Sequence, residues 1–513
     1  MEGLRFSAGP ASCVGQLSGS DSSCEYNHWN SGGATKGIKS GRMTDLHRYL
    51  AAESASVWSI DSPVSLQHEL TALQHELDRA GKHPIVLARN VRNLLGEPSS
   101  IPVVTNLSAS RTLTARALGI DDHRDTARWF ATRSRASIEP NVVARDDAPV
   151  QQVVWEGDAA SLQRLPVLTQ HALEPGPYLT AAHATTFDPD TGIDNTAIQR
   201  CWVQGAKRMT WFPYPTTHNM RNLRKFWDRG EACPVAFWIG HHPAVLLGTQ
   251  AKLRYPESHW AAAGGVLGAP LRVVPSITHG ERIMVPADAE IVIEGFAPPN
   301  VFSADGPFGE YTGYLGAQVQ SPVFDVTRIT MRADAIYHDY GSGLTDMLVP
   351  DNMAMEGKVY EIVRAVAPSL VNVHVPTEGR RFHAYLQLRN PGRGEARDAL
   401  TAALAYRRLK TVIAVDEDVD IFSPEAVLWA LATRVQWSRD SIVVDGLSGS
   451  GLDPSIPEGA STASKMAVDA TLPPPPRPGQ PRAVPPVATV PESAVQRARE
   501  LLQGAGELRW PEA

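Results

Sequence analysis

The stretch Ala304–Tyr314, ADGPFGEYTGY, carries the strongest indication of fold and chemistry in the sequence. Three glycines and one proline in eleven residues indicate a tight turn whose backbone closely approaches its neighbours. Asp305 and Glu310 lie in it beside aromatic residues. Apolar surroundings raise the pKa of a carboxylic acid and suit it to donate a proton near neutral pH. The stretch by itself leaves two interpretations open: a catalytic loop, or a β-turn with two solvated acids.

Residues 141–335, which include this loop, are predicted to be rich in short strands broken by Gly and Pro. Strands so closely spaced are typical of a barrel or sandwich. One inserted helix is expected near Met220–Arg229. The predicted strands are TAAHATTFD, NTAIQRCWVQ, RMTWFPY, PVAFWIG, AVLLG, LRVVPS, AEIVIEGF and PVFDVTRITMR.

Residues 43–140 are predicted to form an N-terminal α/β domain. Two helices are expected, over 45–57 and 61–80, and the second has a leucine at every third or fourth position. The short apolar runs PIVLAR and IPVVTNL, each ending at turn residues, are predicted strands.

Residues 336–471 are predicted to form a third unit, also α/β. A helix over 353–366 is followed by the strand YLQLR, a helix over 395–409 and the strand TVIAVD. Residues 472–513 are predicted to be a Pro-rich linker with a short helix around 493–502. Residues 1–42, rich in Gly and Ser, are predicted to be a disordered extension, with the functional protein beginning near Met43. The predicted fold class is therefore α/β, in several domains.

Composition narrows the functional class. With 43% hydrophobic and 20% charged residues, the 513-residue chain is typical of a globular protein of two or three domains. A net charge of −7 offers no basic face, so no nucleic-acid partner is expected. The four cysteines lack CxxC spacing, which favours a reducing cytoplasm. No apolar run reaches about 18 residues, so no membrane span is predicted.

A second group of chemically distinctive residues is Asn195–Arg200 (NTAIQR), with His218 lying 23 residues beyond Asn195. Amide oxygen and imidazole are suitable ligands for an ion such as Mn²⁺ or Mg²⁺. Two such residues so far apart in sequence do not by themselves define a metal site.

Taken together, these segments resemble the UbiD family of decarboxylases. The family has an Asn-x-x-x-x-Arg segment, a His at this distance, and a Glu-Gly-Pro-Phe-Gly-(Glu/Asp) loop followed by Thr/His-Gly-Tyr. Similar strings occur in PVVTNL (102–107), VDEDVDIF (415–422), VLWALATR (427–434) and SKMAVDAT (464–471). The resemblance covers about residues 45–471 in six ordered motifs.

The resemblance implies a UbiD-like architecture, with prenylated FMN held in a central split β-barrel. Arg200, Asp305 and Glu310 would form the catalytic network. Divalent metal, Mn²⁺ or Mg²⁺, would bridge the protein to the flavin phosphate, with K⁺ as a further candidate ion. The implied metal ligands include Asn195 and His218, and the implied cofactor contacts are Asn195, Ile198, Arg200, Thr217, His218 and Lys465.

Two departures from the family pattern stand out. The first loop acid is Asp305, where the family usually has Glu. The third metal ligand is usually a Glu shortly before an Ala-Gly-x-x-x-Gly segment. Ungapped alignment on residues 263–268 puts His259 there, and Glu257 is two residues away. We favour Glu257 because oxygen donors suit this metal, and His259 is the alternative. Glu294, near the end of a predicted strand, is interpreted as structural.

The implied activity is non-oxidative, reversible decarboxylation of an α,β-unsaturated or (hetero)aromatic carboxylic acid, with Glu310 as proton donor. A flavin prenyltransferase of the UbiX type would supply the cofactor, and a homodimer or larger homo-oligomer is expected. The Ala-, Arg- and Pro-rich composition resembles that of actinomycete proteins. It favours a role in secondary metabolism, such as polyketide tailoring similar to that of the tautomycetin-pathway decarboxylase. The alternatives are an FMN-dependent oxidoreductase and a non-catalytic flavin-binding partner.

Overall fold

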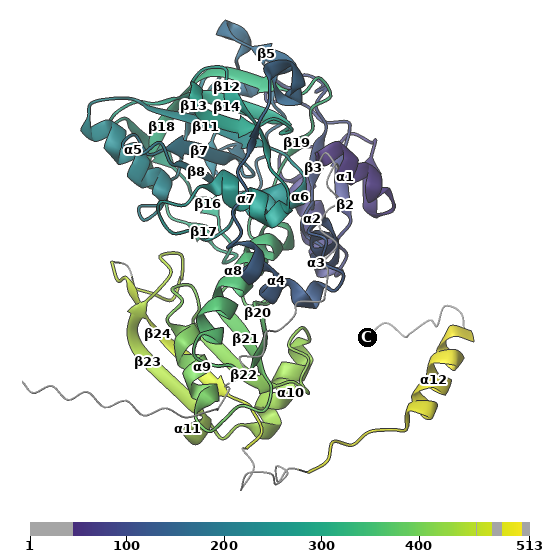
Figure 1. Ribbon diagram of the computed structural model, residues 1–513. Helices are drawn as coiled ribbons and strands as arrows, with labels where there is room; N and C mark the ends of the chain where they lie inside the picture. The colour runs from purple at the N-terminus through teal and green to yellow at the C-terminus, as the bar shows by residue number, and fades with distance from the viewer. Residues whose placement is uncertain (1–44, 458, 474–484, 505–513) are drawn as a thin grey trace, which may run out of the picture. The chain divides into compact units, whose positions relative to one another are not determined.

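The computed structural model describes residues 45–457, 459–473 and 485–504 (Figure 1). The predicted disordered extension over 1–42 and the expected start at Met43 lie outside the described residues, as does most of the predicted linker. The helix expected near the C-terminus is α12 (Glu492–Gly504). Within the described ranges, no helix has both the length and the apolar character that a membrane span requires.

The N-terminal part contains a four-stranded mixed sheet in the order β1-β2-β3-β19. The last strand, β19 (Tyr337–His338), comes from far along the chain and pairs in parallel with β3. The other elements are α1 (Leu46–Ala52), β1 (Val57–Ile60), α2 (Glu69–Arg79), β2 (Ile85–Ala88), β3 (Val103–Thr105), α3 (Arg111–Ala117) and α4 (Thr126–Arg133).

Both N-terminal helix predictions were too long. The helix expected over 45–57 ends at Ala52, and β1 begins at Val57 because that segment pairs in parallel with β2. The helix expected over 61–80 begins only at Glu69. Before it, His68 N donates to Thr169 O at 2.9 Å and Thr169 N donates to Leu66 O at 3.0 Å. These hydrogen bonds to a distant segment keep residues 66–68 out of the helix despite the helical leucine spacing, with Gln67 bridged to Thr169.

The central part is built on an antiparallel sheet in the order β10-β18-β14-β11-β7-β8, with β5 and β15 also pairing with β18. The inserted helix predicted near 220–229 is α5 (His218–Asp228), which packs against β7, β8 and β11. The strands are β5 (Val153–Trp155), β7 (His183–Phe187), β8 (Asp194–Ile198), β10 (Arg208–Thr210), β11 (Cys233–Ile239), β14 (Ile291–Ala297), β15 (Phe302–Asp305) and β18 (Val319–Met331).

Smaller sheets complete this part. β12 and β13 pair antiparallel, and β4 joins β12 in parallel. Two short pairs, β6 with β9 and β16 with β17, flank the chemically distinctive segments. Their bounds are β4 (Asn141–Val142), β6 (Tyr178–Leu179), β9 (Cys201–Trp202), β12 (Arg272–Ser276), β13 (Gly280–Pro286), β16 (Phe308–Gly309) and β17 (Leu315–Gly316).

One predicted strand, AVLLG, is instead helix α6 (Pro243–Gly248). Pro243 occupies the first helical turn, and the His242 side chain accepts a hydrogen bond from Ala244 N. Every residue of α6 is buried, so the run has no polar face to reveal its period. A short apolar run of this kind fits a buried helix as well as a buried strand.

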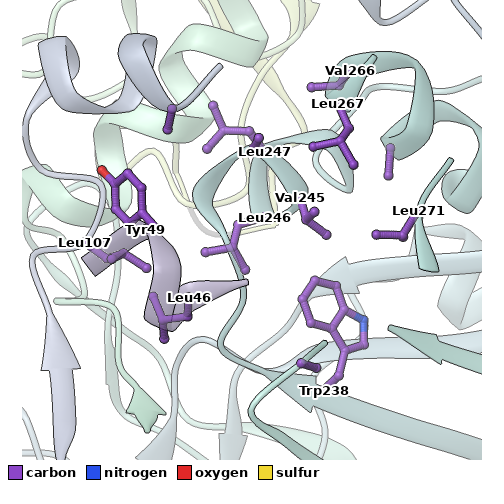
Figure 2. Close-up of a cluster of buried hydrophobic side chains, with 14 of the residues drawn as sticks. Leu46, Tyr49, Leu107, Trp238, Val245, Leu246, Leu247, Val266, Leu267 and Leu271 are labelled. Carbon is purple, nitrogen blue, oxygen red and sulfur yellow. The ribbon is translucent and has the colours of Figure 1, made fainter. Parts of the chain in front are cut away.

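Figure 2 shows the core around α6, where side chains from distant segments meet. The labelled residues are Leu46, Tyr49, Leu107, Trp238, Val245, Leu246, Leu247, Val266, Leu267 and Leu271. They come from α1, β11, α6 and α7 (His259–Leu267), among other segments. This packing fixes the position of α7, whose first residue is a predicted site residue.

The C-terminal part has a five-stranded mixed sheet in the order β20-β21-β22-β24-β23. Helix α8 (Thr345–Arg364) begins eight residues before its predicted start at 353 and contains Pro350. The other elements are β20 (Leu370–His374), β21 (His383–Leu388), α9 (Glu395–Leu404), β22 (Thr411–Asp416), α10 (Pro424–Arg434), α11 (Trp437–Asp440), β23 (Ser441–Ser448) and β24 (Thr462–Asp469). The predicted α/β multidomain class is confirmed.

Candidate functional site

Arg200 links the two acids of the glycine-rich loop. It lies between β8 and β9, and its Nε donates to Asp305 Oδ1 at 3.3 Å. Its Nη1 donates to Glu310 Oε1 at 2.5 Å. The Arg200 side chain is only 8% exposed, so both ion pairs are shielded from water. The structure therefore brings together the three residues that the sequence predicted as a catalytic network.

Aromatic rings enclose the Arg200 guanidinium. Its Cζ atom lies 4.2 Å from the ring centroid of Phe212 and 5.0 Å from that of Phe308. Aromatic faces attract a cation and also orient it. The guanidinium is thus held in one place by the two carboxylates and the two rings.

Asp305, the last residue of β15, is completely buried. Its Oδ1 also accepts a hydrogen bond from Tyr178 Oη at 3.2 Å, and Gly306 N donates to the same tyrosine oxygen at 2.9 Å. Its Oδ2 is buried and has no hydrogen-bond partner among the described residues. Asp305 therefore uses Oδ1 for hydrogen bonds within the protein, whereas Oδ2 is available to a bound group.

Glu310 has an environment that favours its protonated form. Burial raises the pKa of Glu310 above its ordinary value; the positive charges of Arg200 and Arg381 oppose this shift, and Asp305 adds to it. An acid with a raised pKa keeps its proton to higher pH and is suited to proton donation. The two acids therefore differ in surroundings, as different roles require.

Close backbone packing positions the loop between these acids. Gly306 has a φ of +98°, where a side chain would be strained, and a Cβ there would lie 3.1 Å from Ala317 O. Gly309 N donates to Glu174 Oε1 at 3.1 Å. A Cβ on Gly309 would collide with the ring of His171. Both positions therefore require glycine. The sequence alone indicates only that the loop is a tight turn.

Asn195, His218 and His259 lie close together at the ends of three elements. Asn195 in β8 donates from Nδ2 to Asn219 Oδ1 at 2.5 Å, and Asn219 follows His218 at the start of α5. The ring centroids of His218 and His259 are 6.5 Å apart. His259 Nδ1 is buried without a hydrogen-bond partner among the described residues. A buried imidazole nitrogen that no other group bonds is suited to bind a metal.

The start of α7 is tied to β8 by Asp194. Its Oδ2 accepts hydrogen bonds from His259 N at 2.8 Å and Trp260 N at 3.2 Å, and its Oδ1 accepts from Ser258 Oγ at 2.5 Å. These bonds fix His259 relative to the strand that carries Asn195.

Glu257, the ligand favoured from sequence, lies in a different environment. It is exposed, and its Oε2 accepts a hydrogen bond from Arg254 N at 2.9 Å. In the described part of the chain, no three His, Cys, Asp or Glu residues are grouped so as to hold a metal ion. The described geometry therefore favours His259 over Glu257 as a companion to His218.

The other predicted cofactor contacts lie at the start of α5, the end of β8 and in β24 (Thr462–Asp469). Thr217 caps α5, its Oγ1 accepting from Met220 N at 3.4 Å, and Ile198 is the last residue of β8. Lys465 in β24 is buried and donates from Nζ to the carbonyls of Leu404 and Tyr406 at 3.0 Å. Burial lowers the Lys465 pKa to about 8. These contacts lie at the end of α9, so the structure does not bring Lys465 to the Arg200 network.

Glu294 lies in the middle of β14 and is completely buried. It accepts hydrogen bonds from Ile277 N at 3.0 Å, and from Thr278 N at 2.8 Å and Oγ1 at 2.5 Å. Its carboxylate is therefore used to hold the turn between β12 and β13, which fits the structural interpretation.

Sequence reasoning missed several residues around the network. Tyr178, which bonds Asp305, gave no signal because it comes from a two-residue strand more than 120 positions away. A charged group consists of Asp351, Lys252, Arg381 and Arg408, which no spacing in the sequence brings together. The consecutive arginines Arg380-Arg381 and Arg407-Arg408 are visible in the sequence, but nothing in their spacing links them to Asp351.

Comparison with known families decides the classification. Three domain families of 3-octaprenyl-4-hydroxybenzoate carboxy-lyase match this chain: the N-terminal domain at residues 55–132, the Rift-related domain at 141–344 and the C-terminal domain at 352–470. The chain belongs to the UbiD family. Its Arg200–Asp305–Glu310 network lies in the part that matches the Rift-related domain.

Similar proteins in the UbiD family are decarboxylases. The chain is 31% identical to anhydromevalonate phosphate decarboxylase of Methanothermobacter thermautotrophicus, over 81% of this chain and 93% of that protein. The structure of the UbiD-class enzyme HmfF from Pelotomaculum thermopropionicum in complex with FMN matches with a TM-score of 0.79 and 32% identity, covering 88% of this chain and 99% of HmfF. Apo 3,4-dihydroxybenzoic acid decarboxylase (AroY) of Klebsiella pneumoniae matches with a TM-score of 0.78 and 25% identity, covering 89% and 99%. The protein is thus a carboxy-lyase of the UbiD family.

Proposed function

We propose that this UbiD-family carboxy-lyase uses prenylated FMN for non-oxidative, reversible decarboxylation of an α,β-unsaturated or (hetero)aromatic acid. The main support for this proposal is the buried Arg200, which forms ion pairs with Asp305 and Glu310. These two acids lie in different environments. The similarity to HmfF, whose structures are described with FMN and with prFMN, supports the choice of cofactor. Decarboxylation leaves an electron pair that no side chain here can delocalise, and prenylated FMN supplies that electron sink when bound.

The chain's own residues then hold the substrate and deliver a proton. Arg200 orients the substrate carboxylate and keeps Asp305 and Glu310 in fixed positions. Glu310, whose pKa burial raises, donates the proton that replaces the carboxyl group. Asp305 acts through Arg200, because its Oδ1 is bonded to the guanidinium.

For the metal that the family implies, the residues present fit. Asn195, His218 and His259 would hold Mn²⁺ or Mg²⁺, with Glu257 as the alternative third ligand and K⁺ as a further ion. Burial lowers the pKa of His259 to about 3 and also lowers that of His218, so both rings are neutral, as metal binding requires. The cation would supply charge that neutralises the flavin phosphate. Thr217, which caps α5, would contact the cofactor, and helix polarity there also favours an anion.

The substrate class is proposed from similarity, and the biological setting from the Ala-, Arg- and Pro-rich composition. The relatives act on acids as different as anhydromevalonate phosphate and 3,4-dihydroxybenzoic acid, by their names. We propose a cytoplasmic homodimer supplied by a UbiX-type flavin prenyltransferase, with a role in secondary metabolism such as polyketide tailoring.

The decisive experiment is co-expression with a flavin prenyltransferase, followed by mass spectrometry of the bound cofactor and a screen of acids for carbon dioxide release. Prenylated FMN and turnover are the expected results. Turnover of NAD(P)H with unmodified FMN would instead indicate an oxidoreductase. A bound prenylated cofactor with no release of carbon dioxide from any acid would indicate a flavin-binding partner.

A further inference from the structure

Asp351 in α8 is the centre of a charged group of which Asp351 and Arg381 are largely buried and Lys252 and Arg408 are partly exposed. Its Oδ1 lies 2.8 Å from Lys252 Nζ. Its Oδ2 lies 3.1 Å from Arg381 Nη1 and 2.5 Å from Arg408 Nη1. The side chain of Asp351 is 13% exposed and that of Arg381 is 8% exposed. Three cations from three separate segments thus converge on one carboxylate.

The group carries more positive than negative charge. Among the described residues, Asp351 is the one carboxylate within ion-pairing distance of Lys252, Arg381 or Arg408. Although burial acts to raise the pKa of Asp351, the three cations hold it well below its usual value, so the carboxylate is ionised. Three cations against one anion leave two positive charges without a carboxylate. This excess attracts an anion, and Lys252 and Arg408, whose side chains are 31% and 34% exposed, are accessible to one from solution.

Arg381 also has an unused donor. Its Nε is buried and has no hydrogen-bond partner among the described residues, while Nη2 donates to Met347 O at 2.9 Å. Its backbone has a φ of +64°, and that of Arg380 is +48°, a region that few non-glycine residues adopt. Strained residues of this kind cluster at ligand sites. The unpaired Nε and the strained turn are two observations independent of the charge excess.

The group adjoins the proton donor. The Arg381 Cζ atom lies 4.8 Å from the ring centroid of Tyr311, and the Arg408 Cζ atom lies 5.8 Å from it. Tyr311 follows Glu310 in the loop. Lys252, but neither arginine, lines a cavity of about 500 Å³ whose walls also include Glu257, Ser258 and Glu361. An anion bound here would therefore lie beside the loop that carries Glu310, and not at Arg200.

We propose that Lys252, Arg381 and Arg408 form a subsite for a phosphate group on the substrate, at the end away from the carboxylate that is lost. Two guanidinium groups offer paired N–H donors that match phosphate oxygens, and the lysine adds a point charge. The two excess positive charges are balanced by a phosphate dianion, whereas a second carboxylate would balance only one of them. The inference rests on the proposed function, since it assigns one end of the same substrate.

The test uses equilibrium binding, which requires no turnover. Holoenzyme with prenylated FMN is titrated calorimetrically with 5-phosphopentanoate, hexanedioate and 5-hydroxypentanoate, saturated acids that differ in their far end. We expect the phosphate to bind at least about tenfold more tightly than the alcohol, with the dicarboxylate between them. Arg381→Gln should remove most of that advantage, about 10- to 100-fold, without changing binding of the alcohol. Arg389→Gln, at an exposed arginine paired with Glu417, is the matched control.

Three other outcomes would each contradict the proposal and would indicate a different role for the charged group. Equal binding of phosphate and alcohol by the wild type would show that the group has no phosphate preference. Tighter binding of hexanedioate would make it a carboxylate subsite. Loss of FMN affinity in Arg381→Gln, measured by flavin fluorescence on the cofactor-free protein, would assign the cations to the cofactor phosphate.

A structural role is separated in the same experiment. If Arg381→Gln unfolds, Arg408→Gln provides the same comparison, and thermal melting shows which variants are folded. Equal weakening of all three ligands in a folded variant would mean that the group only shapes the loop. Failure of the proposed function would be seen in a different measurement. The wild type would then release no carbon dioxide from unsaturated acids, whichever of the three saturated ligands it bound most tightly.

Discussion

Arg200 donates from Nη1 to Glu310 Oε1 across 2.5 Å, in a place where burial raises the pKa of the same glutamate. The two effects act in opposite directions. Burial favours the protonated acid, whereas the guanidinium favours the carboxylate that remains after a proton is given up. The pair therefore suits an acid that loses and regains a proton in each catalytic cycle.

Replacing Glu310 by Gln should abolish most of the activity while leaving cofactor binding intact. Gln keeps the shape and a hydrogen bond to Arg200 but has no proton to transfer. General acid catalysis contributes about 10²–10⁴-fold, so turnover should fall by that range. Incorporation of solvent deuterium into the product measures proton delivery directly. Glu425→Gln, at an exposed glutamate, is the control for the same chemical change.

Asp305→Asn should also lower turnover, through displacement of Arg200 rather than loss of a proton. Its defect should therefore appear mainly in substrate affinity, with deuterium incorporation per turnover unchanged. A fully active Glu310→Gln variant and an inactive Asp305→Asn variant would reverse the assignment of the two acids.

The pH dependence of turnover should follow the raised pKa of Glu310. As a proton donor, Glu310 must be protonated, so turnover should fall as pH rises through its pKa, which lies above the ordinary value. Arg381 lowers this pKa, so Arg381→Gln should move the falling limb to higher pH at saturating substrate. A limb that stays in place, or moves to lower pH, would show that another group controls it.

His259→Gln should reduce the metal content of the purified protein more than Glu257→Gln. His259 is buried beside His218 with a free Nδ1, whereas Glu257 is exposed and bonded to the Arg254 backbone. A loss in metal affinity of about tenfold or more is expected for the histidine variant. Elemental analysis by mass spectrometry measures this. The opposite order would restore the oxygen ligand favoured from the sequence.

The site residues that could be predicted from the sequence are those that lie in short motifs. Asp305 and Glu310 share one loop, and Arg200 lies five residues after Asn195, so short motifs marked each segment. The resemblance to the UbiD family then linked Arg200 to the two loop acids. The third metal ligand was harder, because two candidates lie two positions apart. The choice depends on how Asp194 holds the start of α7, which no local pattern reveals.

The parts that could not be predicted depend on long-range contacts. Residues 66–68 lie outside α2 because they bond to Thr169, and AVLLG is a helix in a site buried on all sides. The Asp351 group draws its cations from three distant segments. Periodicity and motif spacing describe neighbours along the chain, so they contain no information on these contacts.

Gly309→Ala should impair catalysis by displacing the loop. The backbone of Gly309 tolerates a side chain, but the new Cβ would collide with the His171 ring. Because a shift of about 1 Å can cost roughly 10²-fold in rate, turnover should fall by an order of magnitude or more. The double variant His171→Ala, Gly309→Ala should regain part of it by making room. Equal activity of the single variant and the wild type would show that the loop position is not critical.

Asp346 should make stability depend on pH in a direction opposite to that of an ordinary ion-paired acid. It is completely buried at the start of α8, where its carboxylate accepts hydrogen bonds from Asn106 N at 3.0 Å and Ser108 N at 2.8 Å. Burial raises its pKa from 3.8 to about 7. The folded state therefore binds a proton that the unfolded state has already lost. The resulting stabilisation is complete below pH 3.8 and disappears as pH rises through about 7.

Asp346→Asn replaces the acid by a permanently neutral side chain and should remove this dependence. The amide oxygen keeps one acceptor, so the variant should be less stable by a constant amount while losing the slope. Between pH 4 and 7, the free energy of unfolding of the wild type should decline relative to that of the variant, by at most about 4 kcal/mol. Urea denaturation of both proteins at several pH values in this window measures the difference. Parallel stability curves would show that Asp346 keeps the same charge in the folded and unfolded states, and that its amide hydrogen bonds outweigh the effect of burial.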